Sequence, residues 1–148
     1  MKLTCRSEYA LLALVYLARC RDEEFVPVQI IAANQGIPSK FLEQILHTLR
    51  LAKYLHSYKG KRGGFRLAKS PDQISLAEII RLFDGALAPT DSVSRFFYGP
   101  TPIEKETGLL NLFREVRDFI ADKMERTTLA DVAGRSAELR KETVPAGL

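Results

Sequence analysis

Two amphipathic segments joined by a short glycine-containing turn constrain the fold of this chain more than any other feature. The first segment spans 28–34, and Gly36 ends it. The second follows Pro38, which suits the first turn of a helix, and its apolar residues recur at 3.6-residue spacing: Phe41, Leu42, Ile45, Leu46 and Leu49. The pattern predicts a helix-turn-helix pair, with Ile30 and Ile31 of the first helix facing the core.

The outward face of the second helix is expected to carry hydrogen-bonding side chains of several kinds. Gln44 can pair with adenine through two hydrogen bonds, and Glu43 can accept one from N4 of cytosine. The face therefore suits the reading of DNA base edges, and the alternative is an ordinary solvated helix surface. The residues expected to contact DNA are Ser39, Lys40, Glu43, Gln44 and His47, and Arg50 follows them on the same face.

A glycine-rich basic tip between two strand-like runs predicts a β-hairpin wing. The runs are 54–58 and 65–68. The glycines between them tolerate positive φ and allow the backbone to approach another molecule closely. Lys59, Lys61 and Arg62 should project from the tip, where they suit phosphates or a narrow minor groove. An ordinary charged turn is the alternative.

Positive charge is concentrated in this part of the chain. Residues 44–71 hold seven Lys and Arg and no Asp or Glu, whereas the net charge of the whole chain is only +4. The remainder of the chain is therefore acidic on balance. A local basic patch of this kind predicts a phosphate-bearing partner, and beside a helix-turn-helix pair that partner is double-stranded DNA.

Two further helices complete the expected DNA-binding domain. A helix over 6–19 is apolar on nearly all sides and should form the centre of the core, with Thr4 or Ser7 as its cap. A later helix should begin at Ser75 and end before Gly85. Its inward side chains are expected to be Ile79, Ile80 and Phe83.

The last third of the chain is expected to hold a connector and a long amphipathic helix. The connector, 86–103, carries Phe96, Phe97 and Tyr98, which we expect to pack under the helix that follows; an effector pocket is the alternative. The helix, 107–128, has an apolar stripe too wide for a lone helix to hide, so we expect a homodimer. The stripe is Leu109, Leu112, Phe113, Val116, Phe119, Ile120 and Met124.

Together these features predict a mainly α fold with a small β-hairpin, built as a winged helix-turn-helix domain plus a long C-terminal dimerisation helix. The expected boundaries are a DNA-binding domain over 1–85, a connector over 86–103, a dimerisation helix region over 104–133 and a flexible tail over 134–148. The longest apolar stretch, 9–18, is shorter than the ~20 residues that span a bilayer. No secretory signal is apparent. We therefore expect a cytoplasmic protein without a membrane partner.

Catalytic and metal-binding patterns are missing from the sequence. It has no G-x-S-x-G, P-loop or H-E-x-x-H motif, so an enzyme is not expected. Cys5 and Cys20 are too few and too far apart for a zinc quartet. They are interpreted as reduced thiols, with a redox sensor as the alternative. His47 and His56 suit the surface or DNA rather than a metal site.

One family pattern matches the stretches 1–4, 6–11, 37–46, Gly60 with 63–68, and 74–80 through Asp84 and Gly85. On these stretches the chain resembles the Rrf2 family of bacterial transcription regulators over roughly 1–131. The resemblance implies a dimer of winged helix-turn-helix units with a recognition helix over 39–49 and a long C-terminal dimerisation helix. It also implies that Ser39, Lys40, Glu43 and Gln44 face the major groove and that the basic residues of the wing enter the minor groove.

Two departures from the family pattern matter. Many members carry three cysteines in the connector as ligands of an iron–sulfur cluster, and here 85–103 contains none. We therefore expect no cofactor and no family-type cluster, although a cluster using Cys5 with oxygen or nitrogen ligands stays open. Many relatives have Arg where this chain has Lys59, which should weaken minor-groove reading unless Arg62 takes that role.

The sequence thus predicts a DNA-binding transcriptional regulator that acts as a homodimer on a palindromic operator. The alternative is a winged-helix module that binds a protein, such as a metabolic enzyme, through the aromatic connector. The operator sequence, the regulated genes, the sign of regulation and the signal or effector are left open.

Overall fold

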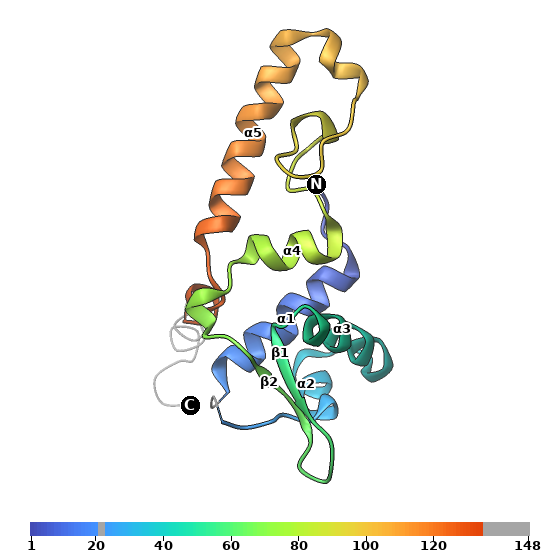
Figure 1. Ribbon diagram of the computed structural model, residues 1–148, viewed down its shortest axis with the longest axis vertical. Helices are drawn as coiled ribbons and strands as arrows, with labels where there is room; N and C mark the ends of the chain where they lie inside the picture. Colours follow the sequence, from blue (N-terminus) through green and yellow to red (C-terminus); the bar gives the residue numbers. More distant parts are fainter. Residues whose placement is uncertain (21–22, 135–148) are drawn as a thin grey trace, which may run out of the picture.

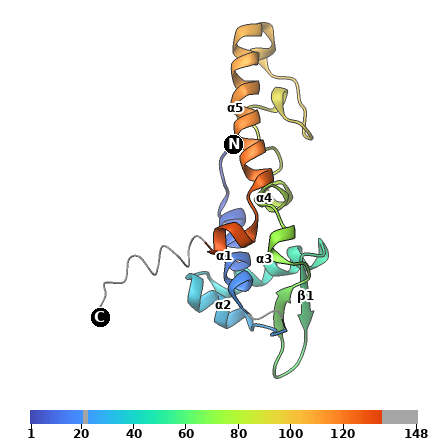
Figure 2. The ribbon, with the colours of Figure 1, turned by 90° about the vertical axis from the view of Figure 1, so that its left-hand side faces the viewer.

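The computed structural model describes residues 1–20 and 23–134. The helix-turn-helix pair and the wing form one end of the molecule, and the last long helix extends away from them (Figures 1 and 2). The mainly α fold with a two-stranded hairpin is confirmed. The elements are α1 (Cys5–Arg19), α2 (Val28–Gln35), α3 (Ser39–Leu51), β1 (Leu55–Tyr58), β2 (Gly64–Leu67), α4 (Leu76–Asp84) and α5 (Thr107–Arg126), with short 3-10 turns at Pro71–Gln73, Asp91–Val93 and Pro102–Lys105. Of the expected tail, residues 135–148 lie outside the described residues.

Helix α1 is the centre of the core, as expected. Its inward side chains are fully or almost fully buried, and the helix packs against α2, α3 and α4. Thr4 is the N-cap, because its hydroxyl accepts a hydrogen bond from the backbone N–H of Ser7 at 3.4 Å. The buried residues of the helix are Ser7, Ala10, Ala13, Leu14 and Leu17.

The helix-turn-helix pair is present with one correction to its packing. Gly36 ends α2 in the left-handed conformation, with φ of 66°, which a glycine adopts without steric cost. Ile31 and Ala32 are buried, but Ile30 is 46% exposed, so the expected inward position of Ile30 is wrong. Successive helical residues are about 100° apart around the axis, and the side of α2 that meets α1 and α3 is centred on the other two residues.

The wing is joined to the chain that precedes α2. Strands β1 and β2 are antiparallel, with Leu55 opposite Leu67 and Tyr58 opposite Gly64. Val26 then pairs with Phe65: each backbone N–H donates to the other residue's carbonyl, at 2.8 and 2.9 Å. A Cβ on Gly64 would collide with the backbone carbonyl of Val26. The sequence suggested that the wing glycines allow the backbone to approach another molecule. At Gly64 they instead allow the wing to approach the backbone of Val26 in the same chain.

Helix α4 begins and ends where the sequence indicated. Ser75 and Glu78 form a capping box, in which each side chain accepts from the other residue's backbone N–H. At the C-terminal end, the Asp84 carboxylate accepts hydrogen bonds from the hydroxyls of Thr4 and Ser7, the latter at 2.6 Å. Burial alone would raise the pKa of Asp84, but these hydrogen bonds and the nearby Arg6 outweigh burial and hold the pKa below its ordinary value.

The lowered pKa of Asp84 gives a prediction for acid stability. A carboxyl whose pKa is lower in the folded state contributes stability above its ordinary pKa of 3.8, and that stability is lost as the pH falls through the folded value. Asp84→Asn should therefore reduce the free energy of unfolding at pH 7 by about 1.5–3 kcal/mol, the scale of hydrogen bonds to a charged group. Urea unfolding at pH 7 and pH 3 checks this. A difference between variant and wild type that does not shrink at pH 3 contradicts it.

The stripe on α5 divides into two parts. Ile120 and Met124 pack within the chain, against a small cluster of Ala77, Ile80 and Leu87. The rest of the stripe is more accessible: Leu109, Leu112, Val116 and Phe119 are 45%, 50%, 37% and 75% exposed. Phe113 is half-buried. In the part of the chain that the structure describes, no helix has the length and apolarity needed to cross a membrane.

Candidate nucleic-acid interface

The outward face of α3 is free of intramolecular packing. Its opposite face is buried in the core through Leu42, Ile45, Leu46 and Leu49, which fixes the rotation of the helix. All the residues that the sequence placed on the outward face are exposed: Ser39, Lys40, Glu43, Gln44, His47 and Arg50. A helix held in this way presents mixed donors, acceptors and charges along one straight edge.

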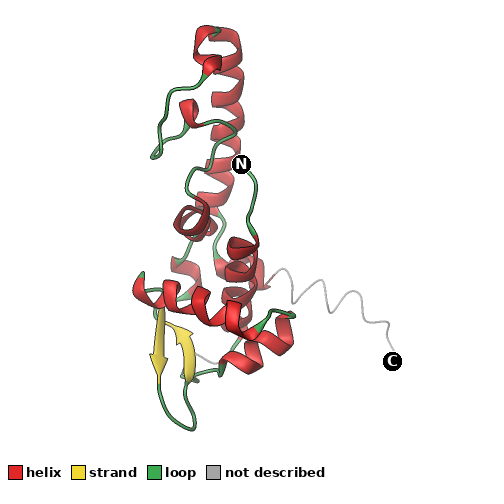
Figure 3. Cartoon of the chain, turned by 90° about the vertical axis from the view of Figure 1, so that its right-hand side faces the viewer, coloured by secondary structure: helices red, strands yellow, loops and turns green. Residues whose placement is uncertain are grey.

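A groove of about 480 Å³ joins this face of α3 to the wing. Its walls include Gln29 from the start of α2, His47 and Arg50 from α3, and Ser57 and Lys59 from the wing. Figure 3 shows the hairpin descending beside α3. The helix face and the wing therefore border one common groove. Of the expected DNA-binding residues, His47 and Lys59 line this groove.

Gln29 and Arg50 also line the groove, although neither was among the residues expected to contact DNA. A terminal nitrogen of Arg50 lies 3.1 Å from Nδ1 of His47, one turn earlier on the same face. Arg50 could have been chosen from sequence, because it is basic and follows His47 by three residues. Gln29 carries no comparable signal, since only the fold brings the start of α2 to the wing.

Arg62 has acidic neighbours that its own stretch of sequence does not reveal. A second hollow of about 440 Å³ is lined by Arg62 and Tyr58 of the wing and by Glu23, Glu24 and Phe25 from the segment before α2. The local sequence of the wing lacks acids, but the fold places two carboxylates on this side of it. Lys59 and Arg62 thus line different hollows of the wing.

The base of the wing is fixed by aromatic contacts. The guanidinium of Arg66 stacks over the ring of Phe25, 4.4 Å from its centroid, so Arg66 serves packing rather than the outer surface. Tyr54 donates a hydrogen bond to Glu78 of α4 at 3.1 Å. Burial, together with the negative charge of Glu78, raises the pKa of Tyr54 to about 12. These contacts hold the wing at a set angle to the helices.

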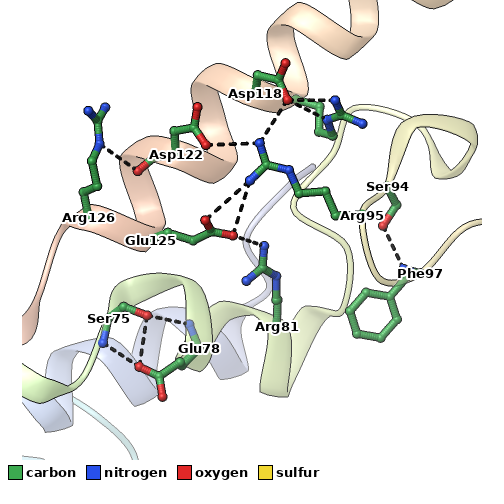
Figure 4. A network of polar contacts seen from close by, with 11 residues as sticks. Ser75, Glu78, Arg81, Ser94, Arg95, Phe97, Asp118, Asp122, Glu125 and Arg126 are labelled. Carbon is green, nitrogen blue, oxygen red and sulfur yellow. Dashed lines mark hydrogen bonds and ion pairs between the residues drawn. The ribbon is translucent and has the colours of Figure 1, made fainter.

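The connector differs from expectation in its aromatic side chains. Phe96, Phe97 and Tyr98 are 68%, 47% and 65% exposed, so their expected packing under α5 is wrong. Val93 is buried in their place, at 2% exposure. A bend after Val93 accounts for the burial of Val93 and the exposure of the aromatic residues. In this bend Ser94 accepts a hydrogen bond from the backbone N–H of Phe97, and the chain turns away from α5 (Figure 4).

The comparison with protein families assigns the chain to one family. The family model for Rrf2, described as an iron-dependent transcriptional regulator, matches residues 3–135. The chain belongs to the Rrf2 family. This Rrf2-family chain is thus a DNA-binding transcriptional regulator, in agreement with its winged-helix architecture.

Relatives and solved structures agree with the family assignment. An HTH-type transcriptional regulator of Mycobacterium tuberculosis is 37% identical, over 90% of this chain and 82% of the relative. The structure of CymR, the global cysteine regulator of Bacillus subtilis, is similar with a TM-score of 0.74 and 27% identity, over 91% of this chain and 98% of CymR. The structure of IscR from T. potens is similar with a TM-score of 0.72 and 25% identity, over 99% and 94% of the two chains.

The iron dependence in the family description does not match the donor side chains of the described residues. Among residues 1–20 and 23–134, no group of three or more His, Cys, Asp or Glu side chains is placed to hold a metal ion. Cys5 is exposed and Cys20 half-buried, at opposite ends of α1. At 1.5 Å rise per residue they are ~22 Å apart, so one site cannot use both. Burial, with the charge of Glu24, raises the pKa of Cys20, which disfavours its thiolate.

Proposed function

We propose that this Rrf2-family regulator is a cytoplasmic homodimer that reads a palindromic operator. One α3 enters the major groove of each half-site, and each wing lies at the adjacent minor groove. The observation that carries the proposal is the shared groove, in which His47 and Arg50 of α3 face Lys59 of the wing. A DNA backbone that runs between α3 and the wing would contact a cation on each side, Arg50 and Lys59.

The two parts of the site have different tasks in this proposal. Glu43, Gln44, Lys40 and Ser39 occupy the N-terminal half of α3, which is the part that reaches base edges in helix-turn-helix proteins. Arg50, Lys59 and the exposed Lys61 contact phosphates. Base contacts specify the sequence, whereas phosphate contacts supply affinity that falls as salt rises.

The exposed half of the α5 stripe supports the homodimer. Its residues are Leu109, Leu112, Val116 and Phe119, at spacings of three, four and three residues. This is the pattern of a short two-helix seam. A second copy related by a two-fold axis covers all four side chains and places two α3 helices on one duplex, with half-sites one or more helical turns apart.

The proposal includes the absence of a family-type iron–sulfur cluster. The connector has no thiol, and Cys5 is the one exposed thiol in the described part of the chain. Protein purified without oxygen should be colourless, free of iron and able to bind its operator. A brown protein with stoichiometric iron contradicts this part of the proposal and leaves the DNA-reading part intact.

Two substitutions on the exposed surface separate base reading from phosphate contact. Glu43→Ala should relax the preference at one base pair of the operator, and the discrimination at that base pair should fall by about 1–3 kcal/mol. Lys61→Ala should weaken binding to all sequences alike and reduce the slope of log K against log salt by about one. Fluorescence anisotropy with matched and mismatched operators, over a salt series, distinguishes them. The reverse assignment of the two effects would show that α3 and the wing are placed in the wrong grooves.

The exposed aromatic residues of the connector favour one second candidate function. Phe96, Phe97 and Tyr98 form an accessible apolar group that suits contact with a partner protein, including a metabolic enzyme. In this alternative the winged-helix fold binds a protein without reading DNA. Selection from a random pool of duplexes separates the two: enrichment of a palindrome supports the operator-reading dimer, and no enrichment at low salt supports the interaction module.

A further inference from the structure

Three arginines and three carboxylates join the connector to α4 and α5. Figure 4 labels two of the arginines, Arg81 and Arg95, and the three carboxylates. Arg95 belongs to the connector, Arg81 to α4 and Arg117 to α5. The carboxylates all come from the C-terminal half of α5. They are Asp118, Asp122 and Glu125. We call these six residues the connector clasp.

Arg95 is the centre of the connector clasp. One terminal nitrogen lies 3.0 Å from Asp118 and 3.1 Å from Asp122, and the other lies 3.4 Å from Glu125. A single guanidinium thus spans two turns of α5. Its planar fork presents two terminal nitrogens at a fixed spacing, a geometry that an ammonium group cannot reproduce.

The other two arginines close the clasp from either side. Arg81 lies 2.7 Å from Glu125, and its guanidinium stacks over the ring of Phe96 at 4.6 Å. Arg117 pairs with Asp118 at 2.7 Å and donates to the backbone carbonyl of Val93 at 2.9 Å. Of the three carboxylates that Arg95 contacts, Asp118 and Glu125 each contact a second arginine as well, which restricts the freedom of their side chains.

We propose that the connector clasp fixes the connector in this Rrf2-family chain, in place of metal ligation, so that the connector is ordered without iron and is released by salt. The connector of this chain has no thiol to bind a cluster. It has instead an arginine that meets three carboxylates of α5. The inference concerns the state of the connector and holds whether or not the dimer reads a palindrome.

Salt is the expected means of release because the clasp is only partly shielded from water. The side chain of Arg95 is 30% exposed, and its three partners are 37–51% exposed. The Debye length falls from about 10 Å at 0.1 M salt to about 3 Å at 1 M. An isolated surface pair contributes little, whereas a network holds its members in place together. The clasp should therefore hold the connector at low salt and lose much of its effect at 1 M.

The connector provides its own probe, because chymotrypsin cleaves after aromatic residues. Phe96, Phe97 and Tyr98 are exposed, but cleavage needs the bend to open so that the chain can enter the protease. We expect slow cleavage of the full-length, chelator-treated protein at low salt and cleavage about tenfold faster in 1 M NaCl, the factor that 1.4 kcal/mol represents. Mass spectrometry assigns the cut, and a small peptide substrate corrects for the effect of salt on the protease.

Variants identify the clasp as the cause. Arg95→Gln should raise the low-salt cleavage rate to the high-salt level, and Asp122→Asn should raise it part of the way. Arg95→Lys should fall between wild type and Arg95→Gln, since it keeps the charge and loses the fork. The matched control is Arg114→Gln, an exposed arginine of α5 whose contact is with Asn111, and it should cleave as wild type does.

Two results would overturn the proposal. One is a cleavage rate that neither Arg95→Gln nor 1 M NaCl changes. The other is a chelator-treated protein that is cut rapidly at low salt and is protected only after iron is restored without oxygen. Thermal unfolding of Arg95→Gln, followed by circular dichroism, shows that the variant is folded. Operator binding is measured separately, so that failure of DNA reading and failure of the clasp are distinguishable.

Discussion

Replacing Gly64 by alanine should lower the free energy of unfolding by about 3 kcal/mol and detach the wing from the segment before α2. The added Cβ would meet the carbonyl oxygen and carbon of Val26 and the backbone nitrogen of Pro27. These are backbone atoms, which cannot rotate out of the way as a flexible side chain can. Relief requires separation of Val26 from Phe65, with rupture of both hydrogen bonds between them.

A matched substitution shows that the effect belongs to the site. Gly108 lies in the first turn of α5, where an added Cβ meets nothing within 4 Å. Gly108→Ala should stabilise the protein by about 0.5–1 kcal/mol, because alanine is favoured over glycine in a helix. Urea unfolding of the two variants checks both signs. A decrease below about 1 kcal/mol for Gly64→Ala, less than one buried hydrogen bond, would show that the segment before α2 yields easily and is not needed to hold the wing.

The second large effect is expected at the exposed face of α5. A double substitution, Leu112→Glu with Phe119→Glu, should make the protein monomeric, because four carboxylates cannot be buried in one two-fold seam. Binding to a palindromic operator should weaken about 100-fold or more, since the second half-site is then no longer bound from the same molecule. Sedimentation velocity measures the assembly, and anisotropy with one and two half-sites measures the binding.

The control for this change lies on the same helix. Asn111 is exposed, beside the stripe rather than in it, so Asn111→Glu should leave assembly and operator binding as in wild type. The two affinities distinguish the causes of a failure. A monomer that still binds the full operator tightly would remove the dimer from the proposed function, and a dimer that persists in the double variant would place the seam elsewhere.

Local signals in the sequence were enough to predict most elements. The boundaries of α4 follow from the capping box at Ser75 and Glu78 and from Gly85, each of which acts within one turn. The outward face of α3 follows from its apolar period. The family resemblance added the order of the domains and the recognition helix, and the family itself is confirmed.

Contacts between distant segments were not predictable in this way. The pairing of Val26 with Phe65, and the approach of Glu23 and Glu24 to Arg62, join parts of the chain that no short pattern connects. The same is true of the aromatic residues of the connector. Their composition suggested burial, but the hydrogen bond at Ser94 and the ion pairs of Arg95 decide which way the bend faces.

The bond between the wing and the segment before α2 has a consequence for operator spacing. Val26 and Phe65 pair across this junction, and Tyr54 donates to Glu78 of α4, so the wing is bonded to the rest of the DNA-binding domain at two places. We expect these bonds to restrict movement of the wing relative to α3. Each DNA-binding domain of the proposed dimer would then bind its half-site as a rigid unit. In the proposed dimer, tolerance for operators of different lengths would reside in the joint between the two α5 helices, and an extra base pair at the centre would strain that joint and leave the contacts at each half-site unchanged.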